Sequence, residues 1–311
     1  MSIFASKIIQ SEMNTLRKIS IAAAVLLAGL NMQAQENPDT SYWSHSGKAG
    51  LTFSQVGFSN WASGGEPSVS FNGILNYGFK YEKAPHLWQT VLDAGYGTQR
   101  IGDSGKPFKK TDDNVVLITR YGYRISNKWY ASAMASFRTQ LFEGYAYEED
   151  TSRLISDRMS PAYSKIGIGI TYNHNFSDKE SFSFTFSPLN GKTTIVLNDT
   201  LSARGEFGVD PGKKLRFEGG MDLTLTLQKE LIKNITLSTT LSTFTAYSDF
   251  GATDVNWDLA LWFKINEFFS ANISTQLVYD QDVNFVNEAG DTYNSAVQFK
   301  EVLGIGLTYS F

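Results

Sequence analysis

The chain has 311 residues, seven prolines, no cysteine and a formal net charge of −4. The lack of cysteine excludes a disulfide framework and a thiolate metal site. The acidic balance argues against a nucleic-acid partner, because phosphate binding needs clustered lysine and arginine. Aromatic residues make up 14% of the chain, which suits β-strands and the aromatic girdles of membrane barrels.

The N-terminus has the pattern of a secretory signal. Arg17 and Lys18 precede an apolar run over residues 19–30, and a small residue, Ala34, lies at the expected cleavage point. We therefore predict a cleaved signal peptide over residues 1–34, with Met13 as the more natural start of translation. A transmembrane helix is the alternative, but about twelve apolar residues are too few for the roughly twenty that a span needs.

After a short polar lead over residues 35–48, residues 49–311 alternate apolar and polar side chains. The clearest case sets Ile166, Ile168 and Ile170 against a lysine and two glycines. Such alternation predicts strands with one apolar and one polar face. Most of these segments have about ten to thirteen residues, close to the nine to eleven that a tilted strand needs to cross a bilayer. The twelve predicted strands are residues 49–58, 68–81, 87–99, 114–124, 129–141, 162–172, 181–187, 216–228, 235–247, 255–265, 269–279 and 295–311.

A secreted β-sandwich or a lipocalin-like barrel would also alternate and would also carry a signal. In those folds the apolar face points inward and the strands usually have about five or six residues. The longer segments here, with Ser, Thr, Asn and Gly at the polar positions, favour a membrane barrel. In such a barrel the apolar face meets lipid and the polar face lines the lumen.

The links between the predicted strands alternate in length. Short links follow the second, fourth, sixth, eighth and tenth strands, and the longest link covers residues 188–214. Outer-membrane barrels have short periplasmic turns and long external loops. We therefore predict an all-β fold, an antiparallel up-and-down transmembrane barrel of twelve strands with both termini periplasmic. Its predicted location is the outer membrane of a Gram-negative bacterium.

The last predicted strand ends in an aromatic residue, Phe311. The closing strands of bacterial outer-membrane barrels take this form, so the expected partners are membrane lipid and the barrel assembly machinery. Glu301 lies on the apolar phase of this strand. It is expected either to reach the outer interface or to mark a β-bulge.

Two stretches between predicted strands are specific enough to compare with a known family. The first contains Asn60, Trp61, Gly64, Gly65 and Glu66. The second is residues 187–194, Ser-Pro-Leu-Asn-Gly-Lys-Thr-Thr. In both, the chain resembles a Bacteroidota outer-membrane family known as DUF3078, a domain of unknown function. The resemblance extends over nearly the whole mature chain. It implies an outer-membrane barrel without an assigned activity, and it supplies no catalytic residues.

The residue types of the first stretch also suggest a structural role without reference to any family. Gly64 and Gly65 tolerate positive φ, and Asn60 is a common turn residue. Trp61 can anchor at the membrane interface or cap the lumen. The stretch is therefore either a structural turn or a loop that folds inward as a gate or docks a partner.

Charged residues on the polar phase are the candidate site. They either hold the wall together or select solutes in a narrow pore. Twelve strands lie between eight, which side chains can fill, and sixteen, which leave an open channel. The predicted lumen charges are Asp93, Arg120, Arg138, Glu218, Asp222 and Asp258.

These observations leave two functions open. The first is a small-solute channel or transporter with a charged lumen. The second is a non-conducting structural or assembly partner that uses its external loops within an envelope complex. An open lumen would favour the first function, and a plugged interior the second.

We expect no enzymatic activity, cofactor or metal site. A surface lipase would need a serine next to a histidine, and His45, His86 and His174 lie before the first strand or in predicted periplasmic turns. They are also too scattered to bind a metal ion. Gly-Lys-Thr at residues 191–193 resembles the end of a phosphate loop, but Phe186 stands where the motif needs its first glycine.

Overall fold

The computed structural model describes residues 42–56, 66–102, 105–147, 152–177, 179–280, 284–286, 292–294 and 297–310. The chain divides into two compact units, Met1–Ser41 and Tyr42–Phe311, and the second contains the fold described below. The predicted signal peptide, residues 60–65 of the first family stretch and Phe311 lie outside the described residues. None of the helices within these ranges is long and apolar enough to cross a membrane.

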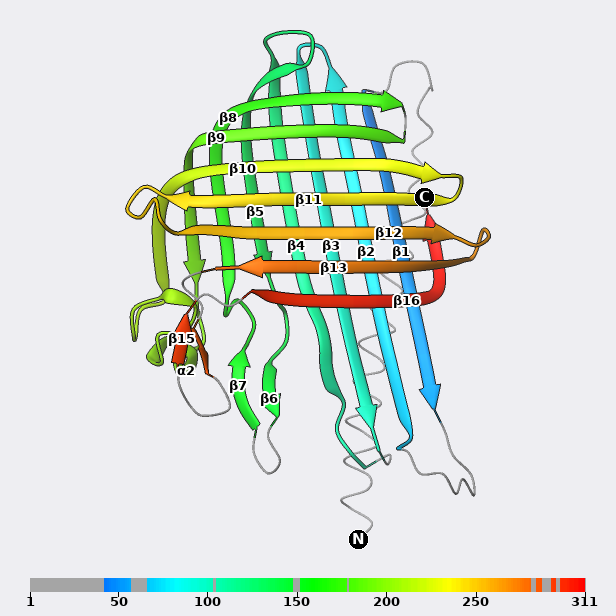
Figure 1. Ribbon diagram of the computed structural model, residues 1–311, viewed down its shortest axis with the longest axis vertical. Helices are drawn as coiled ribbons and strands as arrows, with labels where there is room; N and C mark the ends of the chain where they lie inside the picture. Colours follow the sequence, from blue (N-terminus) through cyan, green and yellow to red (C-terminus); the bar gives the residue numbers. More distant parts are fainter. Residues whose placement is uncertain are drawn as a thin grey trace. The chain divides into compact units, whose positions relative to one another are not determined.

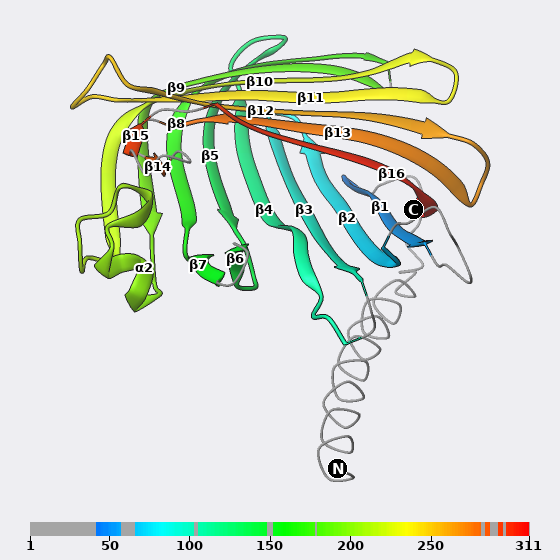
Figure 2. The same cartoon turned by 60° about the horizontal axis from the view of Figure 1, so that its bottom comes forward.

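Twelve antiparallel strands form a closed barrel, as the alternation predicts. Neighbours in the chain are neighbours in the ring, and β1 pairs with β16 to close it, with Lys48 opposite Ser310. Figures 1 and 2 show β2–β5 as one run of adjacent strands, crossed by the run β10–β13. The barrel strands are β1 (Trp43–Val56), β2 (Ser68–Lys83), β3 (His86–Ile101), β4 (Lys109–Arg124), β5 (Trp129–Thr139), β8 (Ala162–Ser177), β9 (Glu180–Ile195), β10 (Leu215–Ile232), β11 (Ile235–Ala246), β12 (Thr253–Lys264), β13 (Phe269–Tyr279) and β16 (Gln298–Ser310).

The apolar phase of the strands points outward. Leu51 and Leu303 are 71% and 67% exposed, whereas inward polar side chains such as Thr185 are fully buried. A soluble barrel would bury its aliphatic side chains, because their transfer out of water is the main favourable term in folding. The exposed belt therefore matches the arrangement expected of a barrel surrounded by lipid.

The tight turns between barrel strands lie at one edge of the barrel, which we call the short-turn edge. Ala84 and Pro85 connect β2 to β3, and the β10–β11 turn contains Asn234 in the left-handed conformation. Asn tolerates that conformation better than most residues. Trp43, the first residue of β1, pairs with Tyr81 beside the β2–β3 turn. β1 therefore begins within the predicted polar lead and at the same edge as the tight turns.

The long links at the other edge contain structure that the sequence analysis did not predict. Val196, Leu201 and Val209 form a small buried cluster in the β9–β10 link. Asn198 caps the helix by accepting hydrogen bonds from two backbone N–H groups, as helix N-caps commonly do. The additional elements are hairpin β6 (Gly144–Tyr147) and β7 (Ser152–Ser156), helix α2 (Asp199–Ala203), the short helix η1 (Glu206–Gly208), and hairpin β14 (Asn284–Val286) and β15 (Thr292–Asn294).

The predicted long link over residues 188–214 is wrong in its first part. Strand β9 continues through the second family stretch to Ile195, with a bulge opposite Gly169 and Met221. Proline normally interrupts a strand because it has no N–H group to donate to the β-ladder. At a bulge the ladder hydrogen bond is already missing, so Pro188 is tolerated there. The bulge therefore keeps the stretch in the barrel wall.

The predicted bulge at Glu301 is also wrong. The pairing of β13 with β16 runs without a shift from Phe269 opposite Leu307 to Val278 opposite Gln298. Glu301 is exposed and lies on the outward phase of β16. The alternative that it reaches the outer interface stays a prediction.

Candidate functional site in the barrel lumen

Two predicted lumen charges meet across the barrel. Arg138 of β5 donates one hydrogen bond to Asp258 of β12 at 3.1 Å and another to Asn256 at 3.4 Å. Gln276 of β13 donates to the other carboxylate oxygen of Asp258 at 2.9 Å. Strands β8–β11 separate β5 from β12 in the ring. A round ring of twelve tilted strands would measure roughly 24 Å across at a spacing of about 4.8 Å. One arginine–aspartate pair cannot span that distance, so the two walls approach each other here.

A second ion pair crosses the lumen between strands that β1–β3 separate in the ring. Lys300 of β16 lies 2.9 Å from Asp112 of β4. The side chains of Lys300 and Asp258 are 42% and 43% exposed although both point inward. Water therefore reaches the lumen at these two pairs.

Lys192 of β9 lies among three carboxylates, one of them the predicted lumen charge Glu218. Its Nζ is 2.5 Å from Asp254, 3.7 Å from Asp280 and 3.8 Å from Glu218, and its side chain is 5% exposed. Arg216 donates to the other oxygen of Glu218 at 2.9 Å. Buried charges are tolerated when they are paired in this way.

Asp222 is the most deeply buried of the predicted charges. Its carboxylate lies 2.8 Å from Nζ of Lys165 in β8 and accepts a hydrogen bond from Thr224 at 2.9 Å. Both carboxylate oxygens of Asp222 therefore have hydrogen-bond partners. This pair ties β8 to β10 across β9.

The structure does not bring Asp93 and Arg120 together, although they lie on adjacent strands as predicted. Asp93 accepts a hydrogen bond from the Asn76 amide, and Arg120 donates to Ser183 of β9 at 2.8 Å. The register explains the separation, because Asp93 pairs with Val116 and Arg120 with Gln89. The predicted lumen charges therefore form separate groups.

These groups divide the lumen into two sides. Strands β8–β10 form the packed side, where the inward polar residues are buried. Strands β12, β13, β16, β1 and β2 form the water-accessible side, where inward residues such as Asn76, Asp258, Gln276 and Lys300 are partly exposed. The buried inward residues of the packed side are Thr171, Thr185, Ser187, Asn190, Lys192, Thr194, Asp222 and Thr224.

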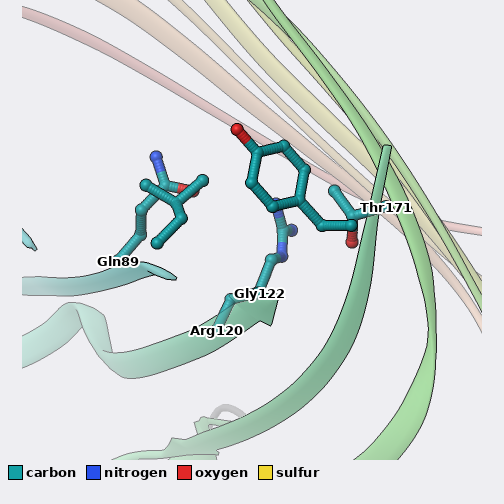
Figure 3. A pocket seen from close by; sticks show the side chains of 6 residues that line it. Gln89, Arg120, Gly122 and Thr171 are labelled. Atoms are coloured by element: carbon teal, nitrogen blue, oxygen red, sulfur yellow. The ribbon is translucent and has the colours of Figure 1, made fainter. Parts of the chain in front are cut away.

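A small cavity lies between β3, β4, β5 and β8 (Figure 3). Its volume is about 10 Å³, close to what a single water centre occupies. It is lined by Leu87, Gln89, Arg120, Gly122, Tyr130 and Thr171.

Two of the three histidines, His86 and His174, have partners other than serine. His86 Nδ1 lies 2.7 Å from the Tyr121 hydroxyl, and His174 Nε2 lies 3.3 Å from Nζ of Lys128. In the first family stretch, Glu66 is described; it is exposed and lies 3.7 Å from Lys106. The remaining residues of that stretch lie outside the described ranges.

Sequence reasoning missed several lumen charges. Lys165, Asp112, Asp254 and Lys300 lie on the inward phase of their strands, so the alternation alone could have found them. Lys192 was missed because it lies within residues 188–214, which were predicted to form a link between strands.

Comparisons with known proteins add a partial family match. A family model described as a protein of unknown function, DUF3078, matches residues 53–145. This match includes the first family stretch and extends past β5 into β6, but it leaves out residues 187–194. The resemblance is therefore found over less than half of the chain, not over nearly all of the mature chain. No curated protein matches.

Solved structures of outer-membrane barrels are similar to the chain at low identity. The translocator domain of the autotransporter NalP from Neisseria meningitidis has 12% identity and a TM-score of 0.35, covering 96% of this chain and 98% of that one. The COG4313 outer membrane channel from Pseudomonas putida F1 has 12% identity and a TM-score of 0.37, covering 89% and 99%. The NanC porin has 7% identity and a TM-score of 0.37, covering 84% and 98%.

Proposed function

We propose that this barrel is an outer-membrane channel for small solutes, with selectivity set by its inward charges. One observation carries the proposal: Asp258 and Lys300 point into the lumen and are still 43% and 42% exposed. Charged rings that water can reach are the usual selectivity elements of narrow pores. The solute path would follow the water-accessible side of the lumen.

The proposed location is the outer membrane of a Gram-negative bacterium. The exposed aliphatic belt, the strand lengths and the gathering of tight turns at one edge all support it. We take the short-turn edge, and with it both termini, to be periplasmic. The barrel assembly machinery would then recognise the last strand with Phe311, and the Bacteroidota origin rests on the family resemblance.

The two cross-lumen ion pairs would make the pore narrow and selective. The Arg138–Asp258 pair and the Lys300–Asp112 pair each place one cation and one anion in the path. A passing ion competes with each pair for the member of opposite charge, because unlike charges attract over short distances even where water reaches them. Solutes small enough to pass beside the pairs would be favoured.

Single-channel recording in planar bilayers tests this proposal. We expect discrete conductance steps from the wild-type protein. Arg138→Gln should shift the reversal potential toward cation selectivity, because it leaves Asp258 uncompensated, and Asp258→Asn should shift it in the opposite direction. A wild-type barrel that migrates as folded on electrophoresis without heating, yet conducts nothing, would contradict the proposal.

The second candidate is a non-conducting structural or assembly partner. The buried cluster of Val196, Leu201 and Val209, which orders an external link, favours it, as do the ion pairs that join opposite walls. Single-channel recording of the double variant Arg138→Gln/Asp258→Asn separates the two functions. If neither this variant nor the wild type shows conductance steps, the structural role is supported.

We also propose that the chain is not a lipase. A serine hydrolase needs a histidine to activate its nucleophile, and His86 and His174 instead neighbour Tyr121 and Lys128. Purified protein should leave a p-nitrophenyl ester of a fatty acid intact. Hydrolysis that disappears in a histidine variant would contradict this.

A further inference from the structure

The seam between β1 and β16, where the barrel closes, is paired over only part of its length. Residues 48–51 of β1 pair with residues 307–310 of β16. By contrast, β1 pairs with β2 over its whole length, and β16 pairs with β13 from residue 307 to residue 298. In Figure 1 the two strands meet near the end of β16 and then run in different directions. Among the described residues, 52–56 of β1 and 298–306 of β16 therefore do not pair with each other, and we call this part of the seam the unpaired seam.

The pairing ends beside two glycines of β16. A Cβ atom at Gly306 would overlap the backbone carbonyl oxygen of Leu51, and one at Gly304 would lie 3.5 Å from the Thr52 hydroxyl. Glycine inside a strand weakens it and often marks a close approach of two backbones. Gly306 therefore permits the contact at the last pair, and the regular ladder stops there.

The unpaired seam lies within the apolar belt. The outward residues Phe53, Leu303 and Ile305 are all exposed. Lipid offers no hydrogen-bond partner to a free strand edge, and each unsatisfied backbone group there costs several kcal/mol. Water in the lumen can supply those hydrogen bonds, because the inward residue Lys300 on the same part of β16 is partly exposed. The lumen and the surrounding lipid therefore approach each other most closely at this seam.

One ion pair holds the free part of β16 in place. Lys300 Nζ lies 2.9 Å from Asp112 of β4, and β1–β3 separate these two strands in the ring. The contact therefore crosses behind the unpaired seam and joins the free part of β16 to the opposite wall. It limits how far β16 can move away from β1.

We propose that the unpaired seam is a lateral opening, restrained by the Lys300–Asp112 pair, through which an amphiphile passes between the lumen and the membrane. The apolar part of such a molecule would follow the exposed outward side chains of the seam. Its polar head would stay with inward groups such as Ser54 and Lys300. The inference rests on the proposed channel only for its water-accessible lumen, and it does not require ion conduction.

Disulfide formation between two strands tests whether the seam is unpaired in the membrane. Ala49→Cys/Tyr309→Cys joins two residues that pair and should cross-link rapidly under a mild oxidant. Phe53→Cys/Ile305→Cys lies on the same outward face, four residues farther along each strand. It should not cross-link, because a disulfide needs Cα atoms within about 7 Å of each other. Equal rates in the two variants would overturn the proposal.

Passage from the lipid is measured with N-(1-pyrenyl)maleimide, an apolar thiol reagent, dissolved in the membrane. It should label Val302→Cys, which points inward beside the unpaired seam, faster than Ser238→Cys. Ser238 is the matched control, because it points inward in the same row of the barrel but its strand is fully paired on both sides.

Lys300→Gln should speed the labelling of Val302→Cys about fivefold, the effect of losing a partly exposed ion pair, and leave Ser238→Cys unchanged. Asp112→Asn removes the same pair and should act alike, so it replaces Lys300→Gln if that variant does not fold. Equal labelling of Val302→Cys and Ser238→Cys, or a rate at Val302→Cys that neither substitution changes, would overturn the proposal.

These results are separable from those for the channel. A barrel that conducts nothing but is labelled at Val302→Cys as described would contradict the channel and retain the lateral opening. A conducting barrel in which Phe53→Cys/Ile305→Cys cross-links as fast as the control pair would do the reverse.

Discussion

Lys192 is the residue on which the packed side of the lumen depends most. Asp254, Asp280 and Glu218 share this cation, which comes from a stretch that looks like a loop in sequence. The alternation of apolar and polar residues predicts which charges on regular strands point inward, such as Arg138. It fails for a charge that follows a bulge, because the extra residue shifts the inward and outward positions by one.

Replacing Lys192 with methionine should destabilise the barrel. The change keeps most of the side-chain volume but removes the cation that three buried carboxylates share, a loss of about 3–5 kcal/mol. Urea unfolding of the barrel in lipid vesicles measures this change in the free energy of unfolding. Lys179→Met is the control, since Lys179 is 68% exposed beside Glu230 and exposed pairs contribute at most about 1 kcal/mol. Equal losses in the two variants would contradict the assignment.

Glu301 provides a second test at the residue scale. Its side chain is exposed on the outward phase of β16, between Phe299 and Leu303. A charge on the lipid face of a barrel is unfavourable, by up to about 2 kcal/mol for an acidic residue away from the interface. Glu301→Leu should therefore raise the free energy of unfolding in vesicles. A clear loss of stability would show that this position does not face lipid.

At the scale of elements, the bulge in β9 explains the main difference between prediction and structure. Ser187 pairs with Asp222, and Asn190 pairs with Gly220, so the two residues between them, 188 and 189, face one residue of β10. Gly169 in β8 permits the close approach, because a Cβ atom there would overlap the backbone carbonyl oxygen of residue 186. The bulge is therefore matched by a glycine on the neighbouring strand.

Gly169→Ala should disturb this bulge. The added methyl group must displace the β9 backbone, which typically costs about 1–3 kcal/mol. Gly219→Ala in β10 is the matched control, since a Cβ atom there would have no neighbour within 4 Å; we expect a change within about 0.5 kcal/mol. Both values come from unfolding in vesicles. A Gly169→Ala barrel as stable as Gly219→Ala would show that the bulge is looser than described.

At the scale of the molecule, the closed barrel of twelve strands could be predicted because period-two alternation is a local signal. Its strand ends agree to within a few residues for strands such as β11 and β13. The partners of the lumen charges could not be predicted in the same way. Arg138 meets Asp258 across 120 positions of the chain, and that contact depends on how closely opposite walls approach, which no local pattern records.

The measurement that tests the whole account most directly is thiol labelling, since the chain has no native cysteine. Ser274 points to the water-accessible side of the lumen, its neighbour Ile273 points outward, and Thr185 is buried on the packed side. In barrels reconstituted in vesicles, a charged, membrane-impermeant thiol reagent should label Ser274→Cys and leave Ile273→Cys and Thr185→Cys unmodified. Labelling of Ile273→Cys with protection of Ser274→Cys would contradict both the lipid-facing belt and the water-accessible lumen.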